Sequence, residues 1–183
     1  KFVDGVAQQW LAAAYPYKTG AFGLGVNYLS VSAFDAYDNA DNPTGSVSAY
    51  DAAAYLSWGG RLPLDYKFLR SVSCGASVKY ISEKLAAHTG AGYGLDLGFL
   101  AETAVEDLRF GFNLENAVST KIKFIADGAR PPLRLKPGVM YEVRYHAVTA
   151  ARFALDYVFP AGAPGYFAAG MEHNFYDAFN VRM

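Results

Sequence analysis

Residues 93–101 alternate strictly between two kinds of side chain, and this alternation constrains the fold more than any other feature of the chain. The segment reads Tyr-Gly-Leu-Asp-Leu-Gly-Phe-Leu-Ala, so large apolar residues occupy the odd positions from Tyr93 to Phe99. Side chains of an extended strand point alternately to opposite faces. One face is therefore large and apolar, whereas the other is small and carries the carboxylate of Asp96. The same period of two recurs along most of the chain, which predicts an all-β protein.

Ten segments carry this alternation and are expected to be strands. They are residues 6–15, 21–32, 47–58, 70–83, 93–101, 108–115, 133–143, 151–158, 166–173 and 178–183. No stretch of useful length shows the 3.6-residue period of an amphipathic helix. We therefore expect one domain over residues 1–183, built as an antiparallel up-and-down sheet. Pro137 is awkward within its segment because it lacks a backbone donor, so it predicts a bulge or the start of a strand.

The composition favours closure of this sheet into a barrel whose outer surface meets lipid. Charged residues make up 18% of the chain, below the roughly 25% of soluble domains. No run approaches the roughly 18 consecutive apolar residues of a membrane-spanning helix, but a closed barrel spans lipid with interleaved polar residues. The net charge of −1 provides no basic field for nucleic acid. The prediction is a transmembrane β-barrel without a nucleic-acid partner.

Charged residues of both signs occupy the small, polar faces of the predicted strands. The lumen-facing candidates are Asp51, Lys79, Glu83, Asp96, Arg109, Glu115, Arg152, Asp156, Glu172 and Arg182. An Arg or Lys facing lipid at the bilayer midplane costs about 2–4 kcal/mol, and several would exceed a whole domain's stability of about 5–15 kcal/mol. This comparison predicts charges inside and aromatic residues outside. The charges would form either a salt-bridge network that fills the interior or a polar track for a solute or head group.

Aromatic residues near the strand ends and the alternation of link lengths agree with a barrel. The expected headgroup-level rings are Tyr28, Trp58, Tyr80, Tyr93, Tyr141 and Tyr157, although strands favour Tyr in any setting. Short links (16–20, 102–107, 144–148 and 174–177) alternate with longer ones (33–46, 84–92, 116–132 and 159–165). Such alternation is typical of the two rims of an outer-membrane barrel. The eleven-residue link 59–69 lies on the short side and breaks the rule.

No residue pattern predicts catalysis, a metal or another cofactor. His88, His146 and His173 fall in separate links without metal-ligand spacing. One loop contains five oxygen-bearing side chains that could bind calcium: Asp35, Asp38, Asn39, Asp41 and Asn42. Their spacing does not match an EF-hand, and Asn-Pro-Thr-Gly is ordinary turn chemistry. No Gly-x-Ser-x-Gly elbow is present, and the single Cys74 excludes an internal disulfide. We expect neither enzyme, metal nor cofactor.

An ordered series of short segments resembles the PorV/PorQ family, within the FadL-like outer-membrane barrels. The segments are 24–29 (LGVNYL), 41–46 (DNPTGS), 78–84 (VKYISEK), 96–98 (DLG), 113–116 (NLEN), 121–124 (KIKF) and 154–156 (ALD). The resemblance runs from about residue 20 to the end of the chain. It implies a barrel of about fourteen strands, within the range of outer-membrane barrels, and an N-terminal plug with an Asn-Pro-Ala motif. That motif is absent, and the chain finishes on Arg182-Met183 rather than on an aromatic residue, so we expect a fragment truncated at both ends.

The resemblance implies location in the bacterial outer membrane, with membrane lipid as the first partner. FadL-like relatives take up fatty acids and aromatic hydrocarbons, so passage or binding of hydrophobic small molecules is the expected function. PorV-like relatives act in type IX secretion, and contact with secretion-system proteins is the alternative. A soluble lipid-binding β-barrel is a further alternative, in which the apolar residues would face inward and the exterior would be charged.

Overall fold

A computed structural model describes residues 5–64, 67–124, 128–176 and 178–183, and it contains a ten-stranded sheet. The strands in the sheet are β1 (Val6–Tyr17), β2 (Gly20–Tyr37), β3 (Pro43–Leu62), β4 (Leu69–Leu85), β5 (His88–Thr103), β6 (Leu108–Ser119), β9 (Arg134–His146), β10 (Thr149–Pro160), β11 (Tyr166–Phe175) and β12 (Phe179–Arg182). Two further strands of two residues each, β7 (Ile122–Lys123) and β8 (Gly128–Ala129), pair in the link between β6 and β9. Nowhere in these ranges is there a helix long and apolar enough to cross a membrane.

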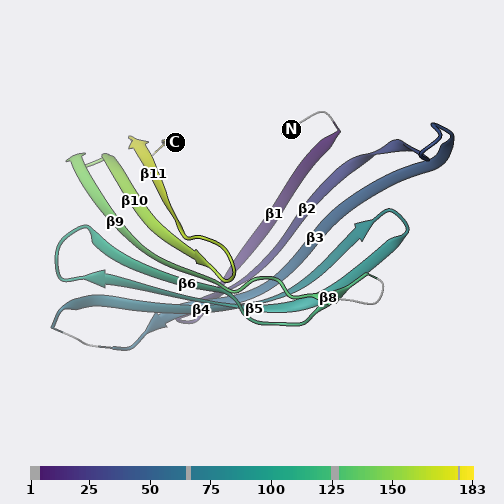
Figure 1. The fold of residues 1–183 in the computed structure, drawn as a ribbon. Coiled ribbons are helices and arrows are strands. Elements are labelled where there is room, and N and C mark those ends of the chain that lie inside the picture. The colour runs from purple at the N-terminus through teal and green to yellow at the C-terminus, as the bar shows by residue number, and fades with distance from the viewer. Residues whose placement is uncertain (1–4, 65–66, 125–127, 177) are drawn as a thin grey trace. The chain divides into compact units, whose positions relative to one another are not determined.

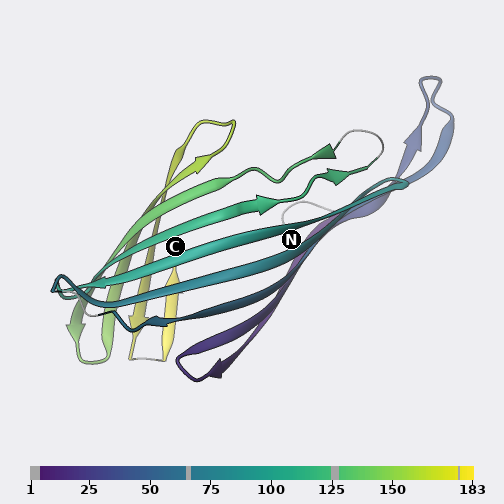
Figure 2. The same cartoon turned by 90° about the horizontal axis from the view of Figure 1, so that it is seen from below.

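The sheet follows chain order, with β1 at one edge and β12 at the other (Figure 1). Figure 2 shows the hairpins that join β1 to β2 and β9 to β10. The predicted all-β antiparallel architecture is confirmed, and every one of the ten predicted segments forms a strand. No pairing between β1 and β12 occurs within the described ranges, so closure into a barrel stays a prediction.

The sequence-based prediction of a long link over 84–92 was wrong. Strand β4 continues to Leu85 and β5 begins at His88, so only two residues make the turn. Ala86 takes a left-handed backbone conformation with φ of 55°, which permits this tight connection. Glycines at 90 and 92 resemble loop residues in sequence. In the structure they are strand residues that accommodate another part of the chain.

That other part is the start of the link between β6 and β9. A side chain at Gly90 or Gly92 would place its Cβ within 2.8 Å of Ile122. Thr120 lies beside the same strand, because its backbone N–H donates to the Tyr93 carbonyl at 2.9 Å. Ile122 is thereby buried with Ala53 and Ile81, and Tyr55 and Phe124 pack against this cluster. The two glycines thus permit a small apolar core beneath the link.

Pro137 lies inside β9 and interrupts pairing on one side only. It pairs with Phe112 of β6. On the β10 side, ladder partners are present at Gly138 and Leu135 but not at Pro137. A missing N–H removes one ladder bond, so the proline is accommodated within a strand rather than at its start.

The chain divides into two compact units, each of which is described by itself. The first comprises residues 1–58, 77–95 and 118–131, and the second comprises 59–76, 96–117 and 132–183. The apolar cluster around Ile122 belongs to the first unit. The second unit buries small and β-branched residues, namely Val72, Ala101, Ala151 and Val158. It also contains most of the ion pairs.

Candidate functional site

The described strand pairs of the large sheet separate mostly apolar side chains from mostly small and polar ones. In the first unit, Leu11 of β1 pairs with Val26 of β2 and Ala13 pairs with Leu24, whereas the alternate positions pair Trp10 with Asn27. Leu11 and Leu24 are 75% and 62% exposed. We call the face that carries these exposed aliphatic residues the apolar face and the opposite one the polar face.

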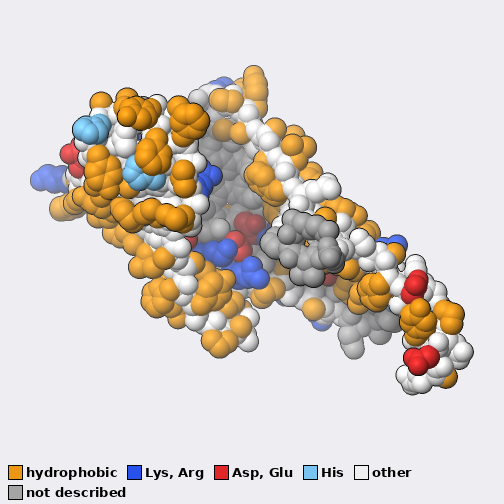
Figure 3. Space-filling view, turned by 90° about the horizontal axis from the view of Figure 1, so that it is seen from above, with side chains coloured by type: hydrophobic (Ala, Val, Ile, Leu, Met, Phe, Trp, Pro, Cys, Tyr) orange, Lys and Arg blue, Asp and Glu red, His pale blue; other side chains and the backbone are white. Residues whose placement is uncertain are grey.

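The second unit repeats this separation on its C-terminal strands. Tyr141, Phe153 and Met171 stand in register on one face of β9, β10 and β11, and Glu142 and Arg152 stand in register on the other. Tyr141 and Phe153 are exposed, whereas Glu142 is only 4% exposed. The space-filling view shows hydrophobic side chains over most of the visible surface, with charged groups gathered in patches (Figure 3).

Most of the aromatic residues expected near the strand ends are exposed. Exposed rings are those of Tyr28, Trp58, Tyr80, Tyr93 and Tyr141. Tyr80 and Tyr93 pair across β4 and β5 with ring centroids 5.3 Å apart. Tyr157 differs, because it is half-buried against Phe159 and Phe167 with centroids 4.3 and 4.6 Å away.

The polar face of the first unit contains an apolar hollow of about 490 Å³. Its walls are the rings of Trp10 and Tyr55, and small residues form its floor: Ala12, Ala14, Gly23 and Gly25. An alanine methyl at Gly25 would make only ordinary contacts, the nearest at 3.7 Å from Tyr55. Packing therefore does not require glycine there, and its absent side chain leaves the hollow open.

Three predicted site residues lie in the first unit, on β3 and β4. Lys79 is buried, Glu83 is half-buried and Asp51 is exposed. Nearby on the same two strands, the hydroxyls of Ser57 and Ser77 hydrogen-bond at 2.7 Å. The remaining seven predicted residues belong to the second unit.

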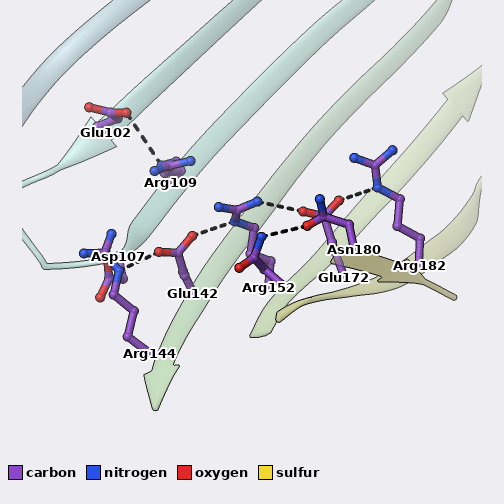
Figure 4. Close-up of polar contacts among 10 residues, drawn as sticks. Glu102, Asp107, Arg109, Glu142, Arg144, Arg152, Glu172, Asn180 and Arg182 are labelled. Carbon is purple, nitrogen blue, oxygen red and sulfur yellow. Dashed lines mark hydrogen bonds and ion pairs between the residues drawn. The ribbon is translucent and has the colours of Figure 1, made fainter. Parts of the chain in front are cut away.

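Four charged residues form a row of alternating sign across the last four strands of the sheet. Glu142, Arg152, Glu172 and Arg182 occupy directly opposed positions on β9, β10, β11 and β12. Arg152 donates from Nε to Glu142 at 2.6 Å and from Nη1 to Glu172 at 2.7 Å. Arg182 donates from Nε to the other oxygen of Glu172. Figure 4 follows these contacts, and we call the four residues the charge row.

The charge row continues beyond Glu142 toward the turn between β5 and β6. Arg144 donates from Nε to Glu142 at 2.7 Å and lies 3.3 Å from Asp107. A separate pair joins Arg109 to Glu102 at 3.6 Å, and Ser71 also donates to Glu102 at 2.7 Å. Glu142 thus holds two guanidinium groups while it is almost completely removed from solvent, which gives these contacts the strength of charge-assisted hydrogen bonds.

A second ionic group surrounds Glu115. Its Oε1 lies 2.5 Å from Lys136 Nζ, and its Oε2 lies 3.7 Å from Arg134 Nη1. On the neighbouring strand, Asp96 accepts the backbone N–H of Asn116 at 2.7 Å. Asn116 adopts a left-handed φ of 55°. The carboxylate therefore stabilises an irregular point near the end of β6.

The polar face of the second unit also contains a hollow, of about 560 Å³. Small residues of five strands contribute to its floor: Gly75, Gly98, Gly111, Gly138 and Ala154. Arg109, Lys136 and Asp156 also line it. A Cβ at Gly138 would lie 2.0 Å from Asp156 Oδ1, so the missing side chain allows this carboxylate to lie over the strand.

The structure joins several predicted residues through partners that the sequence did not select. Arg152, Glu172 and Arg182 form one row, but Glu142, its most buried member, was not among the candidates. Other missed participants are Glu102, Asp107, Arg134, Lys136 and Arg144. Glu102 occupies the next even-numbered position on the polar side of β5. The side-chain alternation would have selected it if the predicted strand had been extended beyond residue 101. Asp107 gave no such signal, because it lies in a turn.

The acidic loop after β2 uses its oxygen atoms for its own turn. Asp38 Oδ1 accepts the backbone N–H groups of Ala40 at 2.8 Å and Asn42 at 2.9 Å. These bonds lower the pKa of Asp38, chiefly through the Asn42 backbone N–H. The part of the chain that the structure describes contains no group of three His, Cys, Asp or Glu residues suited to a metal.

Comparison with protein-family models and with curated proteins gives no match to this chain.

Proposed function

We propose that the chain forms part of the wall of an outer-membrane β-barrel of FadL/PorV type that binds or passes hydrophobic small molecules. The observation that carries this proposal is the separation of side chains by face. Aliphatic and aromatic side chains are exposed along one face of the strands, while carboxylates and guanidinium groups pair on the other. Lipid is the solvent that suits the first face, and a protected lumen suits the second.

The strand lengths agree with a bilayer-spanning wall. Strands β2 to β5 contain 16 to 20 residues, whereas a tilted membrane strand needs about 9–11. On β3, Tyr50 and Trp58 bracket the apolar positions Ala52, Ala54 and Leu56. Eight residues span about 26 Å along a strand, or about 20 Å of depth at a tilt near 40°. That depth is close to the roughly 25 Å apolar band of such barrels.

The hollow in the first unit supports a hydrophobic ligand. It is lined by two aromatic rings, Leu24, Ser57 and small residues rather than by charges. Its volume of about 490 Å³ falls within the usual range for small-molecule sites. A long-chain fatty acid or naphthalene has the matching chemistry. Two aromatic rings beside a floor of small residues favour flat or chain-like apolar molecules over polar solutes.

A soluble lipid-binding barrel fits the faces less well. Such a protein would place the apolar face inside, yet Leu11, Leu24 and Leu56 of that face are each more than half exposed in the part of the chain that the structure describes. A secretion accessory of PorV type would use the same lipid-facing wall. It differs in its expected partner, because cargo proteins rather than small apolar molecules would bind.

The chain contains only two tryptophans, one on each face, and this allows a direct test of orientation. Trp58 is exposed on the apolar face, and Trp10 lines the hollow of the polar face. With the protein reconstituted in vesicles, brominated acyl chains are expected to quench Trp58 in a Trp10→Phe variant. Aqueous iodide is expected to quench Trp10 in a Trp58→Phe variant. Equal quenching of both tryptophans by either agent would contradict the proposed wall.

Ligand binding is tested by titrating naphthalene or oleate against the Trp58→Phe variant and following Trp10 fluorescence. Binding is expected to change the emission, and Gly25→Leu is expected to weaken it by filling the hollow. Gly98→Leu is the matched control, because it adds the same side chain to a strand glycine outside this hollow. If brominated lipid quenched Trp58 but Trp10 fluorescence did not respond to either ligand, the proposed membrane wall would stand and the proposed binding of small molecules would be refuted.

A further inference from the structure

Tyr55 of β3 takes part in two features of the first unit at once. Its ring is a wall of the apolar hollow and lies over Gly25, where an added Cβ would be 3.7 Å from the ring. The same residue packs against the buried cluster of Ala53, Ile81 and Ile122. The hollow and the cluster therefore share one aromatic side chain.

Ile122 is the member of that cluster that comes from outside the ten-stranded sheet. It lies in the link between β6 and β9 and is buried. Two hydrogen bonds hold this part of the link to β5: the Thr120 N–H donates to the Tyr93 carbonyl at 2.9 Å, and the Tyr93 N–H donates to Thr120 Oγ1 at 2.8 Å. Gly90 and Gly92 leave the space beside β5 that the Ile122 side chain occupies. The link thus brings one apolar side chain to a fixed place beside the cluster.

We infer that Ile122 is a positioning residue for the hollow, because it holds Tyr55 in the place where that ring bounds the ligand. Side chains in a close-packed interior stay in one rotamer, since their neighbours fill the space around them. A wall that is ordered before the ligand arrives loses less conformational entropy on binding. The inference rests on the proposed binding of hydrophobic small molecules, and it gives the link after β6 a part in their affinity.

The test titrates oleate against the full chain in detergent micelles and follows Trp10 fluorescence in a Trp58→Phe background. Ile122→Ala is expected to weaken oleate binding by about two- to tenfold, the range that corresponds to ordering one side chain on binding. Ile122→Val retains most of the packing and is expected to bind nearly as tightly as the parent chain. Affinity should therefore follow the size of the side chain at this position.

Two glycine variants on β5 test the same contact without changing the cluster itself. A Cβ at Gly92 would lie 2.8 Å from Ile122, whereas a Cβ at Gly98 would meet nothing within 4 Å. Gly92→Ala is therefore expected to weaken oleate binding, and Gly98→Ala is expected to leave it unchanged. Val72→Ala shortens a buried side chain of the second unit, and it is expected to lower stability without weakening binding.

A double-mutant cycle shows whether Ile122 acts through Tyr55. In a Tyr55→Ala chain, the further change Ile122→Ala is expected to have no effect on oleate affinity, so the two effects are not additive. Strict additivity, unchanged affinity in both Ile122→Ala and Gly92→Ala, or an equal loss in Val72→Ala would overturn the inference. Gly92→Ala, the smaller change, decides the outcome if Ile122→Ala does not fold.

The ligand-free chain separates this inference from the proposed function. Trp10 and Tyr55 line the same hollow, so release of the tyrosine ring by Ile122→Ala is expected to increase quenching of Trp10 by aqueous iodide. If the parent chain did not bind oleate, small-molecule binding would be refuted, and greater quenching in Ile122→Ala would still show that Ile122 positions Tyr55. If the parent bound oleate but Ile122→Ala changed neither affinity nor quenching, the positioning role alone would be refuted.

Discussion

Replacement of Ala54 by arginine measures directly whether the apolar face meets lipid. Ala54 is exposed on β3 and lies midway between Tyr50 and Trp58, four residues from each. Four residues span about 13 Å along a strand, which places Ala54 about 10 Å from either aromatic level at a tilt near 40°. The position is thus the midplane of the proposed wall.

The loss of folding free energy expected from Ala54→Arg depends strongly on whether lipid or water surrounds the new side chain. At the midplane of a membrane barrel, Arg destabilises the folded state by about 2–4 kcal/mol. At an exposed position in water, a substitution away from special features changes stability by no more than about 0.5 kcal/mol. The two expectations differ by enough to be separated by a single unfolding titration.

The assay is urea unfolding of the protein in phospholipid vesicles, followed by tryptophan fluorescence. Neighbouring alanines on β1 provide a matched pair, because both are exposed and point to opposite faces: Ala13 pairs with Leu24 and Ala14 with Gly23. Ala13→Arg is expected to destabilise the protein markedly more than Ala14→Arg. A cost below about 0.5 kcal/mol for Ala54→Arg, or equal costs for the β1 pair, would refute the assignment of faces.

Three further outcomes follow from local geometry. Glu142→Gln weakens two charge-assisted bonds to buried carboxylate oxygens, and the free energy of unfolding is expected to fall by about 2–3 kcal/mol; a double-mutant cycle with Arg152→Met that gave strict additivity would contradict this coupling. Because the pKa of Asp38 is lowered in the folded state, its ionised form contributes stability above the unfolded pKa, and this contribution is lost as pH falls through the folded value. Acid titrations of unfolding are therefore expected to show this loss in the natural chain and not in Asp38→Asn, and identical acid profiles would count against it. Ala86→Gly relieves a left-handed conformation and is expected to raise stability by up to about 1 kcal/mol, as measured by the urea midpoint; a lower midpoint would show that the turn is not strained.

Strand positions could be predicted because alternation is a local property. The side-chain period of two is read directly from residues such as 93–101, and every predicted strand is present. Strand ends were less predictable. Gly90 and Gly92 have the composition of a loop, and only their contact with Ile122 explains why glycine occupies these strand positions. The predicted link over 84–92 failed for this reason.

The candidate site was predictable in part. The alternation of side chains assigned Arg152, Glu172 and Arg182 to the polar faces of their strands. The structure shows that Glu172 contacts both arginines. The sequence could not select Glu142 as the most buried member of the charge row, because register depends on how hairpins align strands far apart in the chain. Nor could it show that Trp10 and Tyr55 share a hollow, since they lie on β1 and β3.

The sequence alone determined the class of fold and which residues share a strand face, because alternation depends only on the geometry of an extended backbone. The tertiary structure decided which charges meet and where the link after β6 folds. Those features depend on register and on contacts between distant segments, and no local pattern records them.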